Sequence, residues 1–75
     1  MNIPQERDGG LTAREREVLH LVAEGYTDAE IGRALHISIY TAQNHVKSIL
    51  GKLKARNRAH AGAMYVRANM ADSSY

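Results

Sequence analysis

The stretch TDAEIGRALHISIYTAQNHVKSILGKL, residues 27–53, decides the fold of this chain. Thr27 followed by Glu30 is a capping box, in which each side chain satisfies a backbone N–H of the first turn of a helix. The helix that starts there is short, over about residues 28–35. A turn of three residues follows, and its last residue, Ser38, is a good N-cap for the next helix. A helix, a three-residue turn and another helix predict a helix-turn-helix unit.

The second helix of this unit has two chemically distinct sides. Its apolar residues recur at offsets 0, 3, 7, 10, 11 and 14, and at about 100° per residue they fall within one arc of about 100°. The residues of this arc, predicted to pack on the core, are Ile39, Ala42, Val46, Ile49, Leu50 and Leu53. A second arc, facing away from the core, holds Tyr40, Gln43, Asn44, Lys47, Gly51 and Lys54. The sequence therefore predicts a helix over residues 39–54 with a polar outer face.

Two further helices flank the unit. Thr12 and Glu15 form a capping box for an earlier helix, and Gly25 is suited to end that helix in the left-handed conformation. Asn57 can cap a last helix over residues 58–69. The fold class is therefore all-α, a four-helix bundle that contains a helix-turn-helix.

Composition divides the chain into one domain with two ends. Residues 1–10 combine a Pro, a Gly pair and charged side chains without an apolar period, which predicts a flexible arm or a linker remnant. Residues 11–70 form the domain, and the polar residues 71–75 are expected to be a disordered tail.

Size and composition exclude several classes of protein. A chain of 75 residues has room for a binding surface but scarcely for an enclosed active site. There is no Cys, no long apolar run and no apolar segment after Met1, so no disulfide framework, membrane span or signal peptide is expected. The expected location is cytoplasmic.

Catalysis and metal binding are not expected either. No nucleophile and base, phosphate-cradling Gly loop or poised carboxylate pair stands out in the sequence. The histidines have no spacing that indicates a metal site. They are His20, His36, His45 and His60. The sequence therefore predicts no enzyme, no cofactor and no small-molecule ligand.

Charge is segregated along the chain. Residues 1–30 carry three basic and seven acidic side chains, a net charge of −4, whereas residues 31–75 carry seven basic and one acidic, a net charge of +6. A basic half of this kind is expected of a protein that binds a polyanion. The alternative is the solvated surface of an ordinary helical domain.

The polar face of residues 39–54 has the chemistry to read DNA. A major groove admits one α-helix, and its base edges are read by amides, cations and apolar contacts. Gln43 and Asn44 can each pair with adenine, Lys47 can reach guanine, and Tyr40 can bond to a phosphate or pack on a thymine methyl. We therefore predict that these four residues read bases and that this helix is the recognition helix, with simple solvation of a polar face as the alternative.

Phosphate contacts are expected around such a face, since they fix register and supply most of the affinity. Candidate residues lie at helix starts and where one helix gives way to the next. They are Thr27, Thr41, Lys52, Lys54, Arg56 and Arg58. The two threonines also have local explanations, because Thr27 is a cap and Thr41 can bond within its own turn.

The last helix, residues 58–69, is apolar nearly all round. One side must close the core, and the other is small enough to pack against its own copy across a two-fold axis. The predicted dimerisation residues are Ala61, Gly62, Met64 and Tyr65. A homodimer of this kind would bind two half-sites about one DNA turn apart.

Two stretches together carry a resemblance to a known family, namely LTAREREVLHLVAEGYTDAEIGRALHIS and YTAQNHVKSILGKLKARNRAHA. They resemble the LuxR/FixJ/NarL-type, or GerE-like, helix-turn-helix domain. The resemblance implies a four-helix DNA-binding domain of transcription regulators, response regulators among them. Such domains are usually dimeric through the last helix. Double-stranded DNA is the implied partner, and RNA polymerase is a further candidate.

The resemblance also implies which residues contact DNA, and it has departures. The family's contact positions fall on Tyr40, Gln43, Asn44 and Lys47, with Thr41 near phosphate. Tyr40 and Gln43 stand where the family often has Lys or Arg, which implies an altered target sequence. Two alternatives stay open: a promoter-binding module like region 4 of sigma factors, and a protein-interaction module that kept the fold and lost DNA binding.

Overall fold

The computed structural model of the chain describes residues 9–73, with the side chains of residues 9–70. Within that range there are four helices and no strand. They are α2 (Ala13–Ala23), α3 (Asp28–Leu35), α4 (Ile39–Leu53) and α5 (Arg58–Ser73). The prediction of an all-α, four-helix domain is therefore confirmed. Residues 1–8 of the predicted arm and residues 74–75 of the predicted tail lie outside the described residues.

The helix starts are set by the predicted caps. Thr12 and Thr27 each accept the backbone N–H of the glutamate three residues later, and each glutamate accepts the backbone N–H of its threonine. Ser38 Oγ accepts the N–H of Thr41 at 3.0 Å at the start of α4. Asn57 Oδ1 accepts the N–H of His60 at 2.8 Å at the start of α5. Local sequence therefore decides where each helix begins.

The helix ends differ from the predicted ones at two places. Gly25 follows α2 with φ of 95°, as predicted, and His36 caps α3 in the left-handed conformation with φ of 61°. Helix α4 ends at Leu53, not at residue 54, because Lys54 is a left-handed C-cap with φ of 56°. Helix α5 continues to Ser73, beyond the predicted end, and so overlaps the predicted tail.

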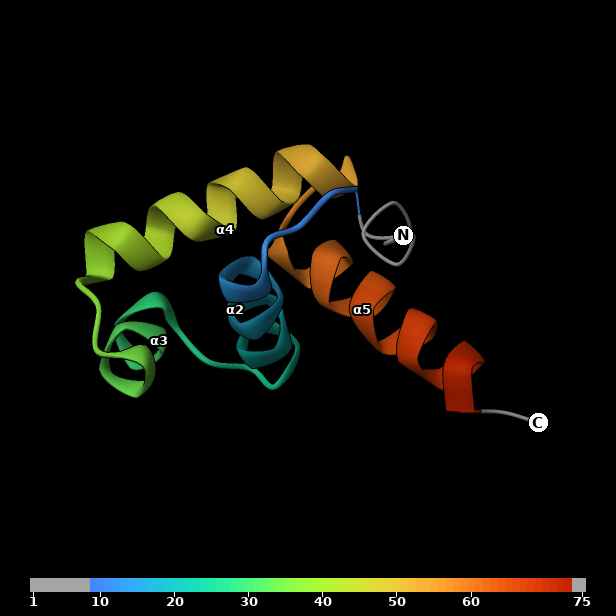
Figure 1. Ribbon diagram of the computed structural model, residues 1–75, viewed down its shortest axis with the longest axis horizontal. Helices are drawn as coiled ribbons and strands as arrows, with labels where there is room; N and C mark the ends of the chain where they lie inside the picture. Colours follow the sequence, from blue (N-terminus) through green and yellow to red (C-terminus); the bar gives the residue numbers. More distant parts are fainter. Residues whose placement is uncertain (1–8, 74–75) are drawn as a thin grey trace.

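The core lies where α2, α3, α4 and α5 meet. Helix α2 stands in the middle and packs against α5 and α4, while α3 packs chiefly against α4 (Figure 1). The buried apolar side chains are Leu11, Val18, Leu19, Ile31, Ala42, Val46, Ile49 and Ala61. Ile39 is a correction to the predicted core stripe, because at 39% exposed it lies at the free end of α4. The rest of that stripe packs on or against the core.

The turn between α3 and α4 is unusually close. A Cβ atom on Gly32 would lie 2.7 Å from the carbonyl oxygen of Ile37, and Ile37 N–H donates back to Gly32 O at 2.9 Å. Only a residue without a side chain fits at such a distance. The glycine thus lets the turn fold back on α3, which fixes the direction in which α4 leaves.

Candidate nucleic-acid interface

The reading face, defined as Tyr40, Gln43, Asn44 and Lys47, lies at the surface. All four side chains are exposed, Tyr40 at 73%. Within residues 9–73 none of the four makes a side-chain hydrogen bond or an ion pair with another described residue. The opposite side of α4 is buried in the core. The helix is thus anchored on one side and offers two amides, an ammonium and a phenol on the other.

The start of α4 is closed by local hydrogen bonds. Thr41 N–H donates to Ser38 Oγ, and Ser38 Oγ–H donates to Thr41 Oγ1 at 3.0 Å. Both residues are exposed. Thr41 therefore makes the hydrogen bond within its own turn that the sequence suggested. Its hydroxyl still lies at the surface, next to Tyr40 of the reading face.

The predicted phosphate-binding cations fall into two groups. Arg58 Nη1 donates to Asp28 Oδ1 at 2.7 Å and its Nη2 donates to the Tyr26 carbonyl at 2.9 Å, so this guanidinium ties the start of α5 to the start of α3. Lys52 Nζ is held by a carboxylate of α2 at 2.8 Å. Lys54 and Arg56, by contrast, are exposed and make no ion pair within the described part of the chain.

Thr27 is occupied by its own helix. Its Oγ1 accepts the N–H of Glu30 at 3.2 Å, and its N–H donates to Glu30 Oε1 at 2.8 Å. Both residues are exposed. The cap leaves the hydroxyl at the surface but bonded within the first turn of α3.

Most of the predicted dimerisation residues face α2 of the same chain. Ala61 is 1% exposed, and Gly62 is buried with the backbone of Ala23 close to it. Tyr65 Oη lies 3.0 Å from His20 Nδ1, and the two rings meet edge to face. Met64 is half-buried. Ala61, Gly62 and Tyr65 thus pack within the protomer, and a role for the four residues in a dimer stays a prediction.

A different side of α5 carries four exposed apolar side chains in one row. They recur at spacings of 4, 3 and 4 residues and form what we name the α5 stripe. The stripe consists of Ala59, Ala63, Val66 and Met70. Val66 is 45% and Met70 64% exposed. The sequence reasoning did not single out this side, because α5 is apolar on nearly every side, although the 4-3-4 spacing is visible in the sequence.

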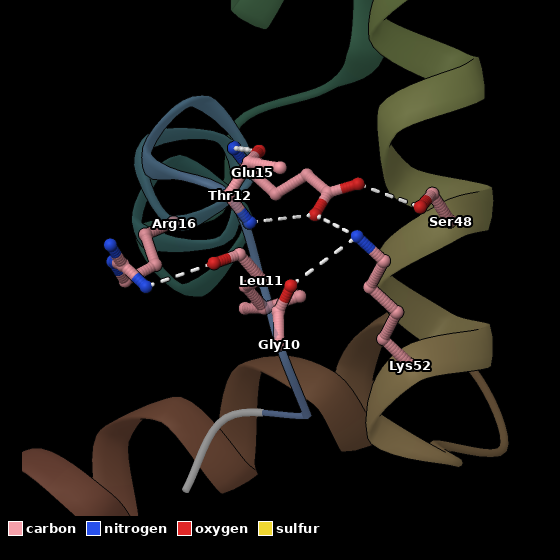
Figure 2. A network of polar contacts seen from close by, with 7 residues as sticks. All are labelled: Gly10, Leu11, Thr12, Glu15, Arg16, Ser48 and Lys52. Carbon is pink, nitrogen blue, oxygen red and sulfur yellow. Dashed lines mark hydrogen bonds and ion pairs between the residues drawn. The ribbon is translucent and has the colours of Figure 1, made fainter. Parts of the chain in front are cut away.

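A polar network joins α2 to α4, and the sequence analysis did not predict it (Figure 2). The Glu15 carboxylate, only 5% exposed, accepts from the backbone N–H of Thr12 at 2.9 Å. It also accepts from Ser48 Oγ at 2.6 Å and from Lys52 Nζ at 2.8 Å. Lys52 Nζ further donates to the Gly10 carbonyl at 3.4 Å. We name Thr12, Glu15, Ser48, Lys52 and Gly10 the Glu15 network.

The network keeps the Glu15 carboxylate ionised. Burial raises the pKa of this carboxyl, but the hydrogen bonds from Lys52, Ser48 and Thr12 and the charge of Lys52 outweigh it and lower the pKa to about 2. The group is therefore an anion throughout the neutral range. Because its partners lie on α4, the charge acts between helices as well as within its cap.

Residues 9–73 hold no group of three or more His, Asp or Glu side chains placed to bind a metal ion. None of the four helices there is both long and apolar enough to span a bilayer.

Comparison with known proteins fits the geometry of these helices. The family described as "Bacterial regulatory proteins, luxR family" matches residues 10–65. The chain belongs to the luxR family. The luxR-family match covers all of α2, α3 and α4 and the first half of α5, so it includes the reading face and the Glu15 network.

Relatives of this luxR-family chain include proteins named "Response regulator protein VraR". The chain is 49% identical over 51 residues to those of Staphylococcus aureus (strain Mu3 / ATCC 700698), Staphylococcus saprophyticus and Staphylococcus epidermidis. The match covers 68% of this chain and 24% of each relative. The luxR-family domain described here thus spans about a quarter of the length of the curated relatives it matches.

Proposed function

We propose that this luxR-family domain regulates transcription by inserting α4 into the major groove of double-stranded DNA and reading bases with Tyr40, Gln43, Asn44 and Lys47. The observation that carries the proposal is the division of α4 into a buried apolar side and an exposed side of unengaged polar groups. A helix held in this way can enter a groove without breaking any of its contacts with the core. Membership of the luxR family supports the same role.

Each side chain of the reading face has a distinct partner in the groove. The amides of Gln43 and Asn44 match the N6 donor and N7 acceptor of adenine, and the Lys47 ammonium suits the O6 and N7 acceptors of guanine. Tyr40, at the open end of α4, can pack its ring on a thymine methyl or donate its hydroxyl to a phosphate. The proposed site therefore contains A·T pairs and a G·C pair.

Backbone contacts complete the proposed interface. Lys54 and Arg56, exposed just after α4, are the cations best placed to meet phosphates, and the Thr41 hydroxyl is a third candidate. Lys52, Arg58 and Thr27 would have to exchange an internal hydrogen bond for a phosphate contact. That exchange makes each of them a weaker contributor to affinity.

The proposed assembly is a homodimer on two half-sites. The α5 stripe has the 4-3-4 spacing of a helix that packs along its own copy, and its members are exposed in the protomer. A two-fold dimer would place two copies of α4 about one DNA turn apart. The proposed role is that of a cytoplasmic regulator of the response-regulator kind, with RNA polymerase as a further candidate partner.

Selection of bound duplexes from a random pool tests the proposal, because it reports binding, half-site spacing and base preference together. With the selected site, Asn44→Ala or Lys47→Ala should each cost roughly 1 to 3 kcal/mol and relax one base position. Lys54→Ala should weaken binding to all sequences alike. It should also lower the slope of log affinity against log salt concentration, the salt slope, by about 1. A uniform loss from all three variants would refute base reading by α4.

Tyr40 favours one alternative, a surface for another protein. It is a large aromatic side chain, 73% exposed, where the family often has a cation. A salt titration of binding to random duplex decides between the two, because a DNA binder must lose affinity steeply as salt rises. Sedimentation with and without DNA tests the dimer, and a monomer under both conditions would count against it.

A further inference from the structure

The Glu15 network meets α4 at two places one turn apart. Ser48 Oγ donates to one carboxylate oxygen at 2.6 Å, and Lys52 Nζ donates to the other at 2.8 Å. The two residues are four apart, so they lie about 40° apart on the helix surface and share one side of it. A single buried side chain of α2 therefore holds α4 by both of its oxygens (Figure 2).

This contact lies on a third side of α4. At about 100° per residue, the core stripe, the reading face and the pair formed by Ser48 and Lys52 lie roughly 120° from one another. The core contact is apolar and therefore has no preferred direction. Hydrogen bonds require both a short distance and a defined angle. The Glu15 contact thus restricts the rotation and sliding of α4 that an apolar stripe alone allows.

We propose that Glu15 is a positioning residue for DNA reading: through Ser48 and Lys52 it fixes the rotation of α4 about its axis, and with it the direction of the reading face. Lys52 accordingly serves this tether and not a phosphate contact. The inference rests on the proposed function, since it concerns how accurately α4 is presented to DNA. It assigns to Glu15 a role beyond its capping box.

The chain that leads into α2 takes part in the same tether. Lys52 Nζ also donates to the Gly10 carbonyl at 3.4 Å, and Arg16 Nη1 donates to the Leu11 carbonyl at 3.0 Å. The segment before α2 is therefore held against both α2 and the C-terminal half of α4. Loss of the Lys52 ammonium would remove one hydrogen bond that holds α4 and one that holds this segment.

Glu15→Gln is the sharpest test, because Gln keeps the size of the side chain and can still complete a capping box. It removes the charge that holds Lys52 and can offer only one acceptor oxygen. The ratio of affinity for the selected site to affinity for random duplex should fall on the order of ten-fold, about the worth of one base contact. Glu17→Gln, the same change on the exposed side of α2, should leave that ratio within about two-fold.

Lys52 variants separate a tether from a phosphate contact. Lys52→Met should lower the ratio while the salt slope for random duplex stays the same, and Lys52→Arg should restore the ratio. If Lys52 instead contacts a phosphate, Lys52→Met lowers the slope by about 0.9 and leaves the ratio unchanged, which overturns the proposal. Circular dichroism confirms that each variant is folded, and Ser48→Ala takes the place of Glu15→Gln if the latter unfolds.

Residual dipolar couplings of the free protein test the orientation of α4 without DNA. They report the angle between α2 and α4, which should change in Glu15→Gln and not in Glu17→Gln. In Glu15→Gln, an unchanged angle between α2 and α4 would overturn the tether, and so would an unchanged ratio of affinities. If the unaltered domain binds no duplex selectively, the proposed function fails, and the angle still decides whether Glu15 orients α4.

Discussion

Two helices of this domain start with the same four-residue pattern and the same local geometry, yet the two starts differ in what they do. Thr12 and Glu15 begin α2, and Thr27 and Glu30 begin α3. In both, the threonine hydroxyl accepts one N–H and the glutamate carboxylate accepts another, at 2.8 to 3.2 Å. As helix caps the two are equivalent.

Their surroundings separate them. Glu30 is exposed, and within residues 9–73 its carboxylate has no partner beyond its own turn. Glu15 is 5% exposed and is bonded to two residues of α4 that follow it by 33 and 37 positions. A buried charge is costly unless it is paired and hydrogen-bonded. A capping motif therefore fixes where a helix starts, whereas burial decides how much the same carboxylate contributes to the free energy of unfolding.

The largest expected effect is the difference in stability between Glu15→Gln and Glu30→Gln at neutral pH. Loss of the Glu15 charge should cost about 3 kcal/mol, because the ordinary pKa of 4.5 falls to about 2 in the folded domain. Loss of the Glu30 charge should cost roughly 0.5 kcal/mol, the usual effect of one exposed charge at a helix start. Urea unfolding of both variants measures the difference, and equal losses would contradict it.

The pH dependence of that difference is the second test. The folded domain lowers the pKa of Glu15, so the stability this group contributes is fully present above its ordinary pKa of 4.5. It is lost as the pH falls through that value toward about 2. Urea unfolding between pH 7 and pH 2 should show the deficit of Glu15→Gln shrinking from about 3 kcal/mol toward zero. A deficit that stays constant with pH would show that shape, not charge, explains it.

The smallest difference between the two helix starts is expected for the threonines, because their hydroxyls have the same role in both caps. Thr12→Ala and Thr27→Ala each remove the hydroxyl that accepts the third N–H of a helix, and each should cost about 1 kcal/mol. Thermal unfolding of the two variants at neutral pH measures this local part alone. A Thr12 variant less stable than the Thr27 variant by more than about 1 kcal/mol would mean that the cap and the tether are coupled.

Most of the fold could be predicted from the sequence, because it depends on local chemistry. The caps at Thr12, Thr27, Ser38 and Asn57 and the left-handed stop at Gly25 are confirmed. A cap needs only residues within one turn of each other, so spacing along the chain is enough to find it. The apolar period of α4 likewise predicted its buried side, except at Ile39, the first residue of the helix, which is 39% exposed.

Contacts between helices could not be predicted in the same way. Nothing in the sequence shows that Ser48 and Lys52 meet Glu15, because the partners lie in different helices and their meeting depends on how the helices cross. Lys52 and Arg58 were predicted to contact phosphate, but each has a carboxylate partner in another helix of the domain. These partners could not be predicted for the same reason. On α5, apolar residues on nearly every side left the choice of inner side open, and Ala61 and Gly62 belong to it.

The placement of the reading face required no long-range information. Tyr40, Gln43, Asn44 and Lys47 are exposed simply because they share the side of α4 that the apolar stripe leaves free. Lys54 differs, since its left-handed backbone takes it out of the helix on which it was predicted to lie. Its position therefore follows the turn into α5.

Both helices of the helix-turn-helix end on left-handed residues that are not glycine, His36 after α3 and Lys54 after α4. Each costs roughly 1 kcal/mol or more of backbone strain, and each has far fewer accessible conformations than glycine would have. The junctions on either side of α4 are therefore stiff. The glycines Gly9 and Gly10 stand before α2, both with positive φ. The Gly10 carbonyl accepts from Lys52 Nζ, so this glycine pair is held to the domain, and in a longer regulator the four helices would move together as one rigid body.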